Sequence, residues 1–219
     1  MAATAALAAG AAVARGQPAR SVDLELVLAV DCSLSIDDGE FRLQAEGTAA
    51  AFTDPAVLRA ITGGEAGAIA VAYLQWAGPH EQRLAIPWTR IDGRASAYRF
   101  SDQFRRQPRA FRGDATSIGS AVDFARQVFQ RNPFRGVRRT IDISGDGVSN
   151  AGRIPPRARD DAVADGITIN ALPILSEYAG LDRYFRDEVI GGPGAFVLPA
   201  PDFTAFAQAI RAKLIRELA

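Results

Sequence analysis

The sequence has very few of the residues that build disulfides, histidine-rich zinc sites and lysine-based phosphate sites. Cys32 is the only cysteine, so no internal disulfide can form, and we predict a small buried side chain at the end of an apolar segment. His80 is the only histidine, which excludes a zinc site built from several histidines. Lys213 is the only lysine, in the last predicted helix and far from any loop that follows a strand.

The chain also lacks an excess of charge and long apolar runs. Its 219 residues include 25 Lys and Arg against 25 Asp and Glu, and neither sign forms a long block, so we expect no nucleic-acid-binding face. After residue 20 no apolar run approaches the ~20 residues of a membrane-spanning helix. The 48% of hydrophobic residues suffices for a sizeable core, and the length favours one domain.

Residues 1–20 differ from the rest of the sequence. They begin with MAATAALAAGAAVARG, a small and apolar stretch in which Ala12-Val13-Ala14 matches the A-x-A pattern of a signal-peptide cleavage site. The basic segment that opens a signal peptide is missing, which leaves an incomplete export signal or a disordered alanine-rich tail as interpretations. Export predicts a periplasmic or secreted protein, and the tail a cytoplasmic one. Both leave residues 21–219 as the folded domain.

From residue 21 onward, strand-like and helix-like patterns alternate, which predicts an α/β domain of Rossmann-like type. We expect a mostly parallel central sheet with one antiparallel edge strand and helices on both faces; Pro87 suits the edge strand. The predicted strands are 22–30, 67–76, 83–91, 137–144, 167–174 and 194–200. The predicted helices are 37–53, 94–107, 115–130, 155–166, 181–190 and 202–218.

Oxygen-bearing side chains follow two of the predicted strands and precede one helix. Asp31, Ser33 and Ser35 come directly after the first strand, in LELVLAVDCSLS. Asp146 lies in the Gly-Asp-Gly turn after 137–144, and Thr116 enters the helix in RGDATSIGSAVDFA. Because ligands of open α/β sheets bind outside the carboxyl ends of the strands, we expect these five side chains to meet there.

Two carboxylates and three hydroxyls suit a hard divalent cation. Mg²⁺ prefers oxygen ligands in octahedral geometry and keeps some of its water, and Mn²⁺ or Ca²⁺ can take similar donors. Two carboxylates roughly neutralise the ion, while the hydroxyls add ligands without further negative charge. The ion then stays electrophilic enough to accept a further carboxylate from a partner.

These motifs resemble the metal-ion-dependent adhesion site (MIDAS) of von Willebrand factor A (VWA) domains. The resemblance rests on D-x-S-x-S after an apolar strand, a threonine at a helix start and an aspartate in IDISGDG, and it covers residues 22–219. It implies that Ser33, Ser35 and Thr116 bind the metal through hydroxyls, and that Asp31 and Asp146 bind it directly or through water. SGDGVSN, GITINALPI and VIGGPGAFVLPA are similar to a bacterial family of unknown function within the VWA superfamily. The resemblance implies a non-enzymatic, metal-dependent module that binds an acidic side chain of a protein partner.

Other interpretations of the same residues stay open. Ser33, Ser35 and Asp37 are typical helix caps, Thr116 suits an N-cap, and Asp146-Gly147 is typical of a turn.

Two other functions compete with a metal-dependent module. An aspartate after the first strand together with a Gly-Asp-Gly turn also resembles phosphatases of haloacid-dehalogenase type, but such an enzyme needs a second acidic residue where Ser33 stands and a lysine near the phosphate. A serine hydrolase lacks a G-x-S-x-G elbow here and has only His80 as a base. A VWA scaffold that never loads metal is the third possibility.

Overall fold

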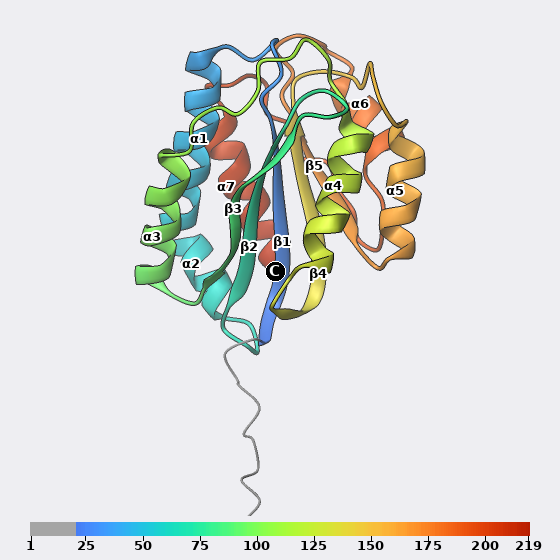
Figure 1. Ribbon diagram of the computed structural model, residues 1–219. Helices are drawn as coiled ribbons and strands as arrows, with labels where there is room; N and C mark the ends of the chain where they lie inside the picture. Colours follow the sequence, from blue (N-terminus) through green and yellow to red (C-terminus); the bar gives the residue numbers. More distant parts are fainter. Residues whose placement is uncertain (1–20) are drawn as a thin grey trace, which may run out of the picture.

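The computed structural model describes residues 21–219 and consists of a five-stranded sheet between two layers of helices (Figure 1). The strands are β1 (Ser21–Asp31), β2 (Ile69–Trp76), β3 (Gln82–Ile91), β4 (Arg135–Gly145) and β5 (Thr168–Pro173). Their order across the sheet is β3-β2-β1-β4-β5, and among them β3 alone runs antiparallel to its neighbour. The predicted α/β class and the antiparallel edge strand are confirmed. The segment 1–20, with its predicted export signal, lies outside the described residues.

The helices cover both faces of the sheet. They are α1 (Asp38–Thr53), α2 (Pro55–Thr62), α3 (Arg94–Arg105), α4 (Ile118–Gln130), α5 (Pro155–Ala164), α6 (Leu181–Tyr184), the π-helical turn η2 (Phe185–Val189) and α7 (Phe206–Leu218). In Figure 1, α1, α2, α3 and α7 lie on one side of the sheet, and α4, α5 and α6 lie on the other.

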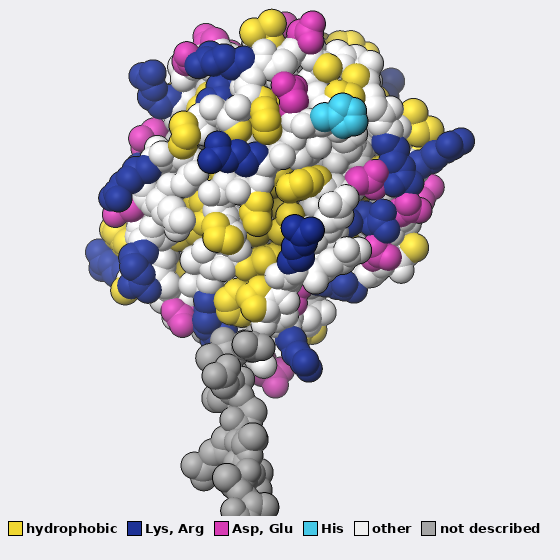
Figure 2. Space-filling view, viewed as in Figure 1, with side chains coloured by type: hydrophobic (Ala, Val, Ile, Leu, Met, Phe, Trp, Pro, Cys, Tyr) yellow, Lys and Arg dark blue, Asp and Glu magenta, His cyan; other side chains and the backbone are white. Residues whose placement is uncertain are grey.

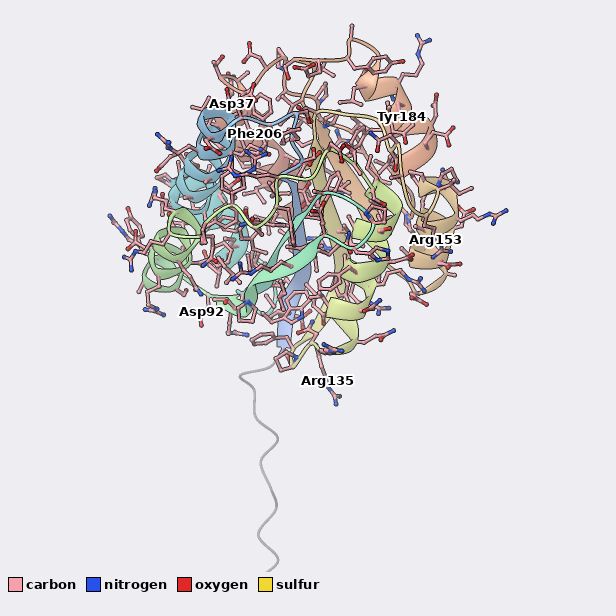
Figure 3. The ribbon with its side chains drawn as sticks, turned by 45° about the horizontal axis from the view of Figure 1, so that its top comes forward. Asp37, Asp92, Arg135, Arg153, Tyr184 and Phe206 are labelled. Atoms are coloured by element: carbon pink, nitrogen blue, oxygen red, sulfur yellow. The ribbon has the colours of Figure 1, made fainter. Side chains whose placement is uncertain are left out.

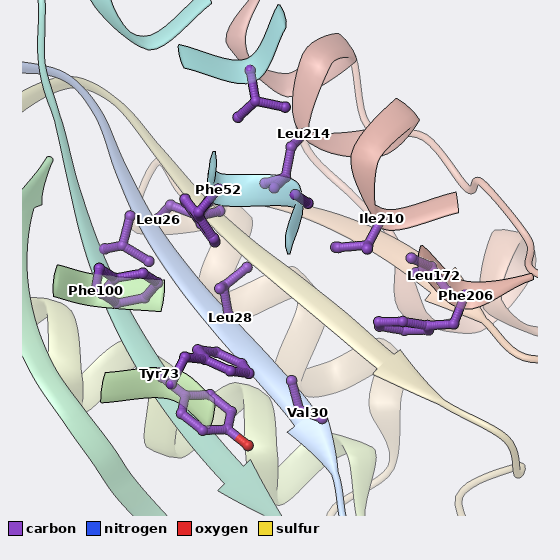
Figure 4. Packing of buried hydrophobic residues seen from close by; sticks show 14 of the residues in the cluster. Leu26, Leu28, Val30, Phe52, Tyr73, Phe100, Leu172, Phe206, Ile210 and Leu214 are labelled. Atoms are coloured by element: carbon purple, nitrogen blue, oxygen red, sulfur yellow. The ribbon is translucent and has the colours of Figure 1, made fainter. Parts of the chain in front are cut away.

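The central strand β1 is buried on both faces. Leu26 and Leu28 point into the core under α1, α3 and α7, where they meet Phe52 and Phe100 (Figure 4). Val27, between them in the sequence, belongs to the core under α4 and α5. Side chains alternate between the faces of a strand, so a continuous apolar run is what a doubly covered strand requires. Because β1 is packed on both faces, its last residues are held rigidly at the end of the sheet where the parallel strands finish.

One predicted strand was wrong, and one helix was not predicted. Residues 194–200 form no continuous strand and pair with β5 and the residue after it through isolated bridges, Val197 with Ala171 and Ala200 with Ile174. Gly194 has a positive φ of 73°, which bends this segment at its start. The helix α2 has no counterpart among the predicted helices, the first of which ends at residue 53, just before Pro55. Proline is favoured at the first position of a helix, and here Asp54 caps that helix by accepting hydrogen bonds from the next two amides.

The surface carries charges of both signs. On the face seen in Figure 2, Lys and Arg side chains are interspersed with Asp and Glu, and neither sign gathers into one large patch. Of the helices between residues 21 and 219, none has the length and apolar character needed to cross a membrane.

Candidate metal centre

The loop after β1 holds three of the predicted ligands in a tight turn. Asp31 is the last residue of β1 and is fully buried. Its Oδ1 accepts a hydrogen bond of 2.8 Å from the backbone amide of Ser33. The Ser33 hydroxyl in turn lies 3.3 Å from the Ser35 hydroxyl. This turn therefore places one carboxylate and two hydroxyls side by side.

The end of β4 adds the second carboxylate. Strands β1 and β4 are parallel neighbours, with Val30 paired to Ser144, so their carboxyl ends meet. The Ser35 hydroxyl donates a hydrogen bond of 2.9 Å to Asp146 Oδ1. A side chain at Gly145 would place its Cβ 2.8 Å from Asp31 Oδ2. A side chain at position 145 would crowd the Asp31 carboxyl group, so the glycine leaves room for Asp31 beside Asp146 at the carboxyl ends of the two strands.

Thr116 lies at the same carboxyl end of the sheet, in the loop before α4. It is 7% exposed, and its amide donates a 2.8 Å hydrogen bond to the Asn150 side chain. Asn150 also donates its own amide to the Thr116 carbonyl, at 2.9 Å. A Cβ on Gly147 would lie 3.9 Å from the Thr116 hydroxyl, which places this hydroxyl beside the turn of Asp146. The structure therefore brings all five predicted side chains together at the carboxyl ends of the parallel strands.

Of the polar residues that the sequence suggested as helix caps, only Asp37 caps a helix with its side chain. Asp37 is the N-cap of α1 and exchanges two hydrogen bonds of 2.8 Å with Glu40. Figure 3 turns this end of the molecule toward the viewer, with Asp37 at the start of α1 and Tyr184 at the end of α6. The Ser33 and Ser35 hydroxyls make the contacts described above instead. Helix α4 is preceded by Ser117 at its N-cap position, not by Thr116.

The two carboxylates are incompletely satisfied within the protein. Asp31 Oδ2 and Asp146 Oδ2 are buried and have no hydrogen-bond partner. Burial, with a contribution from the Asp146 carboxylate, raises the pKa of Asp31 to about 7. Burial also raises the pKa of Asp146, while its hydrogen bond from Ser35 opposes this shift. Buried carboxylate oxygens are normally paired, so these two atoms fit a cation.

The donor set differs from that of a zinc site built from histidine and cysteine. Within residues 21–219 no group of three His, Cys, Asp or Glu side chains lies together in a metal-binding arrangement. The candidate centre therefore depends on hydroxyl oxygens as well as on carboxylates, which is the chemistry of a hard cation such as Mg²⁺. Cys32, beside Asp31, is buried as predicted, and burial raises its pKa to about 12, so its thiol stays protonated at neutral pH.

Arg109 positions the loop of the candidate ligands, and sequence reasoning missed it. Its guanidinium donates hydrogen bonds to the Cys32 and Ser33 carbonyls, the shortest of them 2.6 Å, and to the Phe111 carbonyl. It also pairs with Asp38 at 3.2 Å, while its side chain is only 5% exposed. The chain has many arginines, and contacts to backbone carbonyls leave no sequence signal.

We expect Arg109→Met to loosen this loop. The variant leaves the Cys32 and Ser33 carbonyls without their charged donor, which should lower the free energy of unfolding by about 2 kcal/mol. Because residues that orient metal ligands typically affect affinity by 10–100-fold, Mg²⁺ affinity should fall by roughly tenfold. Urea unfolding and Mg²⁺ titration measure the two effects.

Arg112→Met is the matched control for this variant. Arg112 also pairs with Asp38, at 2.8 Å, but its side chain is 61% exposed, and its hydrogen bond goes to that carboxylate. We expect this control to retain wild-type stability and Mg²⁺ affinity. Equal losses in both variants would show that Asp38, rather than the loop carbonyls, is the important partner of Arg109.

Residues 21–219 match the model of a family described as "Protein of unknown function (DUF1194)". The chain belongs to DUF1194. A comparison with curated proteins found no match.

Solved structures show that the DUF1194 chain has a VWA-like fold. Proximal thread matrix protein 1 of the mussel byssus aligns with a TM-score of 0.63 at 16% identity, over 91% of this chain and 48% of that protein. A von Willebrand factor type A structure from Catenulispora acidiphila aligns with a TM-score of 0.60 at 17% identity, over 90% and 43%. The pilus adhesin SpaC of Lactobacillus rhamnosus GG has a TM-score of 0.60 at 12% identity, over 90% and 31%. The chain thus spans less than half of each of these proteins.

A further structure of the mussel protein contains metal. A structure of the mussel protein is described as having a zinc-occupied MIDAS motif, and it aligns with a TM-score of 0.64 at 16% identity. The likeness at this identity establishes the shared fold of the DUF1194 chain, as predicted from its sequence motifs.

Proposed function

We propose that residues 21–219 form a VWA-type module that binds a protein partner through a divalent cation at the carboxyl edge of the sheet. The observation that carries this proposal is the pair of buried, unpartnered oxygens, Asp31 Oδ2 and Asp146 Oδ2, beside three hydroxyl side chains. Buried carboxyl oxygens without a partner are costly, and a cation between the two groups would satisfy both of them.

Each of the five residues has a role in this centre. The hydroxyls of Ser33, Ser35 and Thr116 would hold the ion directly, and Asp31 and Asp146 would hold it directly or through water. Mg²⁺ suits this oxygen donor set, with Mn²⁺ or Ca²⁺ as alternatives. When bound, the ion supplies an electrophilic centre that accepts a carboxylate oxygen from an acidic side chain of the partner.

The surroundings of the centre favour a protein as the partner. Leu34 lies between two of the proposed ligands and is 60% exposed, and Val148, two residues after Asp146, is 39% exposed. Apolar side chains next to a polar anchor are typical of interfaces in which one specific contact is surrounded by desolvated surface. A zinc-loaded MIDAS in a structurally similar protein gives further support.

We propose a binding module rather than an enzyme. A phosphatase of haloacid-dehalogenase type needs a second carboxylate where Ser33 lies. It also needs a lysine at the phosphate, but Lys213 is fully buried and contacts Asp142 and Glu217 instead. A metal-free VWA scaffold remains the competing proposal, and metal titration separates the two.

Export of the protein is a further part of the proposal. The A-x-A pattern at Ala12-Val13-Ala14 favours a cleaved signal and a periplasmic or secreted domain. An adhesion-type module that meets partners outside the cytoplasm suits such a location.

Calorimetric titration of Mg²⁺ and then Mn²⁺ into the metal-stripped protein tests the metal site. We expect saturable binding in the wild type and none in the Asp31→Asn/Asp146→Asn variant. Thr116→Val, which removes a single hydroxyl, should weaken binding by at least tenfold, whereas the control Thr62→Val should not. Thr62 is exposed and hydrogen-bonds only within α2. A well-folded wild type that binds neither ion would contradict the proposal and favour the metal-free scaffold.

Water proton relaxation with Mn²⁺ tests whether the bound ion can accept a carboxylate. Mn²⁺ bound to the protein should retain exchangeable water and therefore enhance relaxation. We expect added acetate to displace part of that water and to reduce the enhancement. Relaxation that does not respond to acetate would argue against an acidic partner, even if the metal itself binds.

A further inference from the structure

A second group of buried charges lies away from the candidate metal centre, between β4 and α7. Asp142 projects from β4, and Lys213 and Glu217 lie one turn apart on α7. Lys213 Nζ is 2.6 Å from Asp142 Oδ1 and 2.8 Å from Glu217 Oε1. All three side chains are buried, and that of the lysine is 0% exposed. The sequence alone gave this lysine no function.

The surroundings hold these groups in place and exclude water. The ring centroid of Phe196 lies 5.0 Å from Lys213 Nζ. Asn170 donates a 2.8 Å hydrogen bond to Glu217 Oε1 and accepts one of 2.9 Å from the Phe196 amide. Asp142 Oδ2 and Glu217 Oε2 have no hydrogen-bond partner. The amine and both carboxyl groups therefore face mainly each other.

Lys213, Asp142 and Glu217 can carry one positive charge and two negative charges, so one extra proton would make this buried group neutral. Two carboxylates and one ammonium would leave a net negative charge in an apolar interior, which is costly. Burial raises the pKa of Asp142, and the Glu217 carboxylate adds to this increase, while Lys213 opposes it. Burial therefore favours the neutral carboxyl form of Asp142, directly beside the Lys213 nitrogen.

We propose that Lys213 and Asp142 join through an intramolecular amide bond, an isopeptide cross-link, with Glu217 as the catalytic residue that transfers the proton. The geometry supplies the three groups that such a condensation requires: an amine, a carboxyl carbon and a neighbouring carboxylate in contact with the amine nitrogen. This inference is independent of metal binding.

The proposed step is balanced without any co-reactant. A proton first passes from the Lys213 ammonium to the Asp142 carboxylate, which gives a neutral pair. The amine nitrogen then attacks Asp142 Cγ, and the new C–N bond forms as the nitrogen loses a proton to the Glu217 carboxylate. Glu217 returns that proton to the departing oxygen, the C–O bond breaks, and one water molecule leaves. The products are an amide and water, and Glu217 is regenerated.

Enforced proximity accounts for a condensation that is unfavourable in free solution. Groups held at contact distance have effective concentrations of roughly 10⁵–10⁸ M, and removal of water from the site opposes the reverse hydrolysis. The cross-link would join the middle of the sheet to the C-terminal helix.

Tryptic digestion of the denatured full chain, followed by mass spectrometry, tests the proposal directly. The bond should produce one branched peptide, in which residues 140–153 are joined to residues 212–216 with the loss of one water. Trypsin cannot cleave after a modified Lys213, and no other lysine in the chain can give a similar product. If the wild type gives only linear 140–153 and linear 214–216, with no branched peptide, the proposal is overturned, because the three residues then form only an ion pair.

Two variants and a control test the chemistry. Glu217→Gln keeps the size of the side chain but cannot accept the proton, so we expect at least a tenfold lower yield of branched peptide. Lys213→Arg should give only linear peptides. Glu46→Gln, at an exposed glutamate that pairs with Arg105 at 3.0 Å, should retain the wild-type yield. An unchanged yield in a folded Glu217→Gln variant would overturn the role of Glu217.

Discussion

Metal-free protein should become less stable as the pH rises from about 4 to about 7, and Mg²⁺ should reverse this loss. The pKa of Asp31 is raised from 3.8 to about 7 in the folded state. Between these values the unfolded chain has released the Asp31 proton and the folded chain still holds it, so a higher pH favours unfolding. The contribution is fully present below the unfolded pKa and is lost above the folded one. Its size is on the order of 4 kcal/mol.

Urea unfolding across this pH window, with a chelator and then with Mg²⁺, measures the effect. Above about pH 7 the Asp31 carboxylate is charged and available to a cation, so stabilisation by Mg²⁺ should be larger there than at pH ~5. Asp31→Asn has no charge to lose at this position. The difference between wild type and this variant isolates Asp31 from other buried carboxyl groups. Identical pH profiles in wild type and variant would contradict the prediction.

The sheet was predictable because its strands carry their own signals. The strand 22–30 is apolar on both faces, as a strand covered twice must be, and Pro87 marks the edge strand. The segment 194–200 carries a similar apolar signal. The apolar pattern does not predict the bend at Gly194, and the pairing of this segment with β5 depends on that bend. Periodicity therefore identified the long and regular elements. It failed where local backbone conformation determines whether a segment forms a strand.

The five candidate ligands were predictable because the fold class fixes where strand ends meet. Asp31 and Asp146 follow strands that pair in parallel, so their proximity follows from topology. The supporting contacts could not be predicted. Arg109 and Asn150 act on backbone atoms of the Cys32–Ser33 segment and of Thr116, and such contacts depend on how loops fold in three dimensions. The sequence also gave no reason to bring Lys213 to Asp142, since nothing in its pattern distinguishes it from a surface lysine on an amphipathic helix.

Lys213→Met should be among the most damaging substitutions in this protein. It leaves Asp142 and Glu217 buried without their cation, which typically costs about 3–5 kcal/mol. Loss of the proposed cross-link adds to this effect, because closing a loop of about 70 residues stabilises a fold by roughly 4 kcal/mol in the chain-entropy model. Since whole domains are stable by about 5–15 kcal/mol, the variant is expected to be marginally folded at 37 °C. Urea unfolding followed by circular dichroism measures the loss.

The electrostatic loss and the loss of the cross-link can be separated in a variant from which the buried carboxylates are removed as well. In Asp142→Asn/Lys213→Met/Glu217→Gln no buried charge is left in this group, so the electrostatic part of the loss should be recovered, whereas the part due to the cross-link should remain. A residual deficit of roughly 4 kcal/mol relative to wild type would match the cross-link, and full recovery would mean that an ion pair alone stabilises this region. Arg211→Met is the control on the same helix: its guanidinium pairs with Asp54 at 2.8 Å but is 46% exposed, so its loss should have little effect. A Lys213→Met variant as stable as this control would contradict both contributions, because neither a buried cation nor a covalent bond could then be holding α7 to β4.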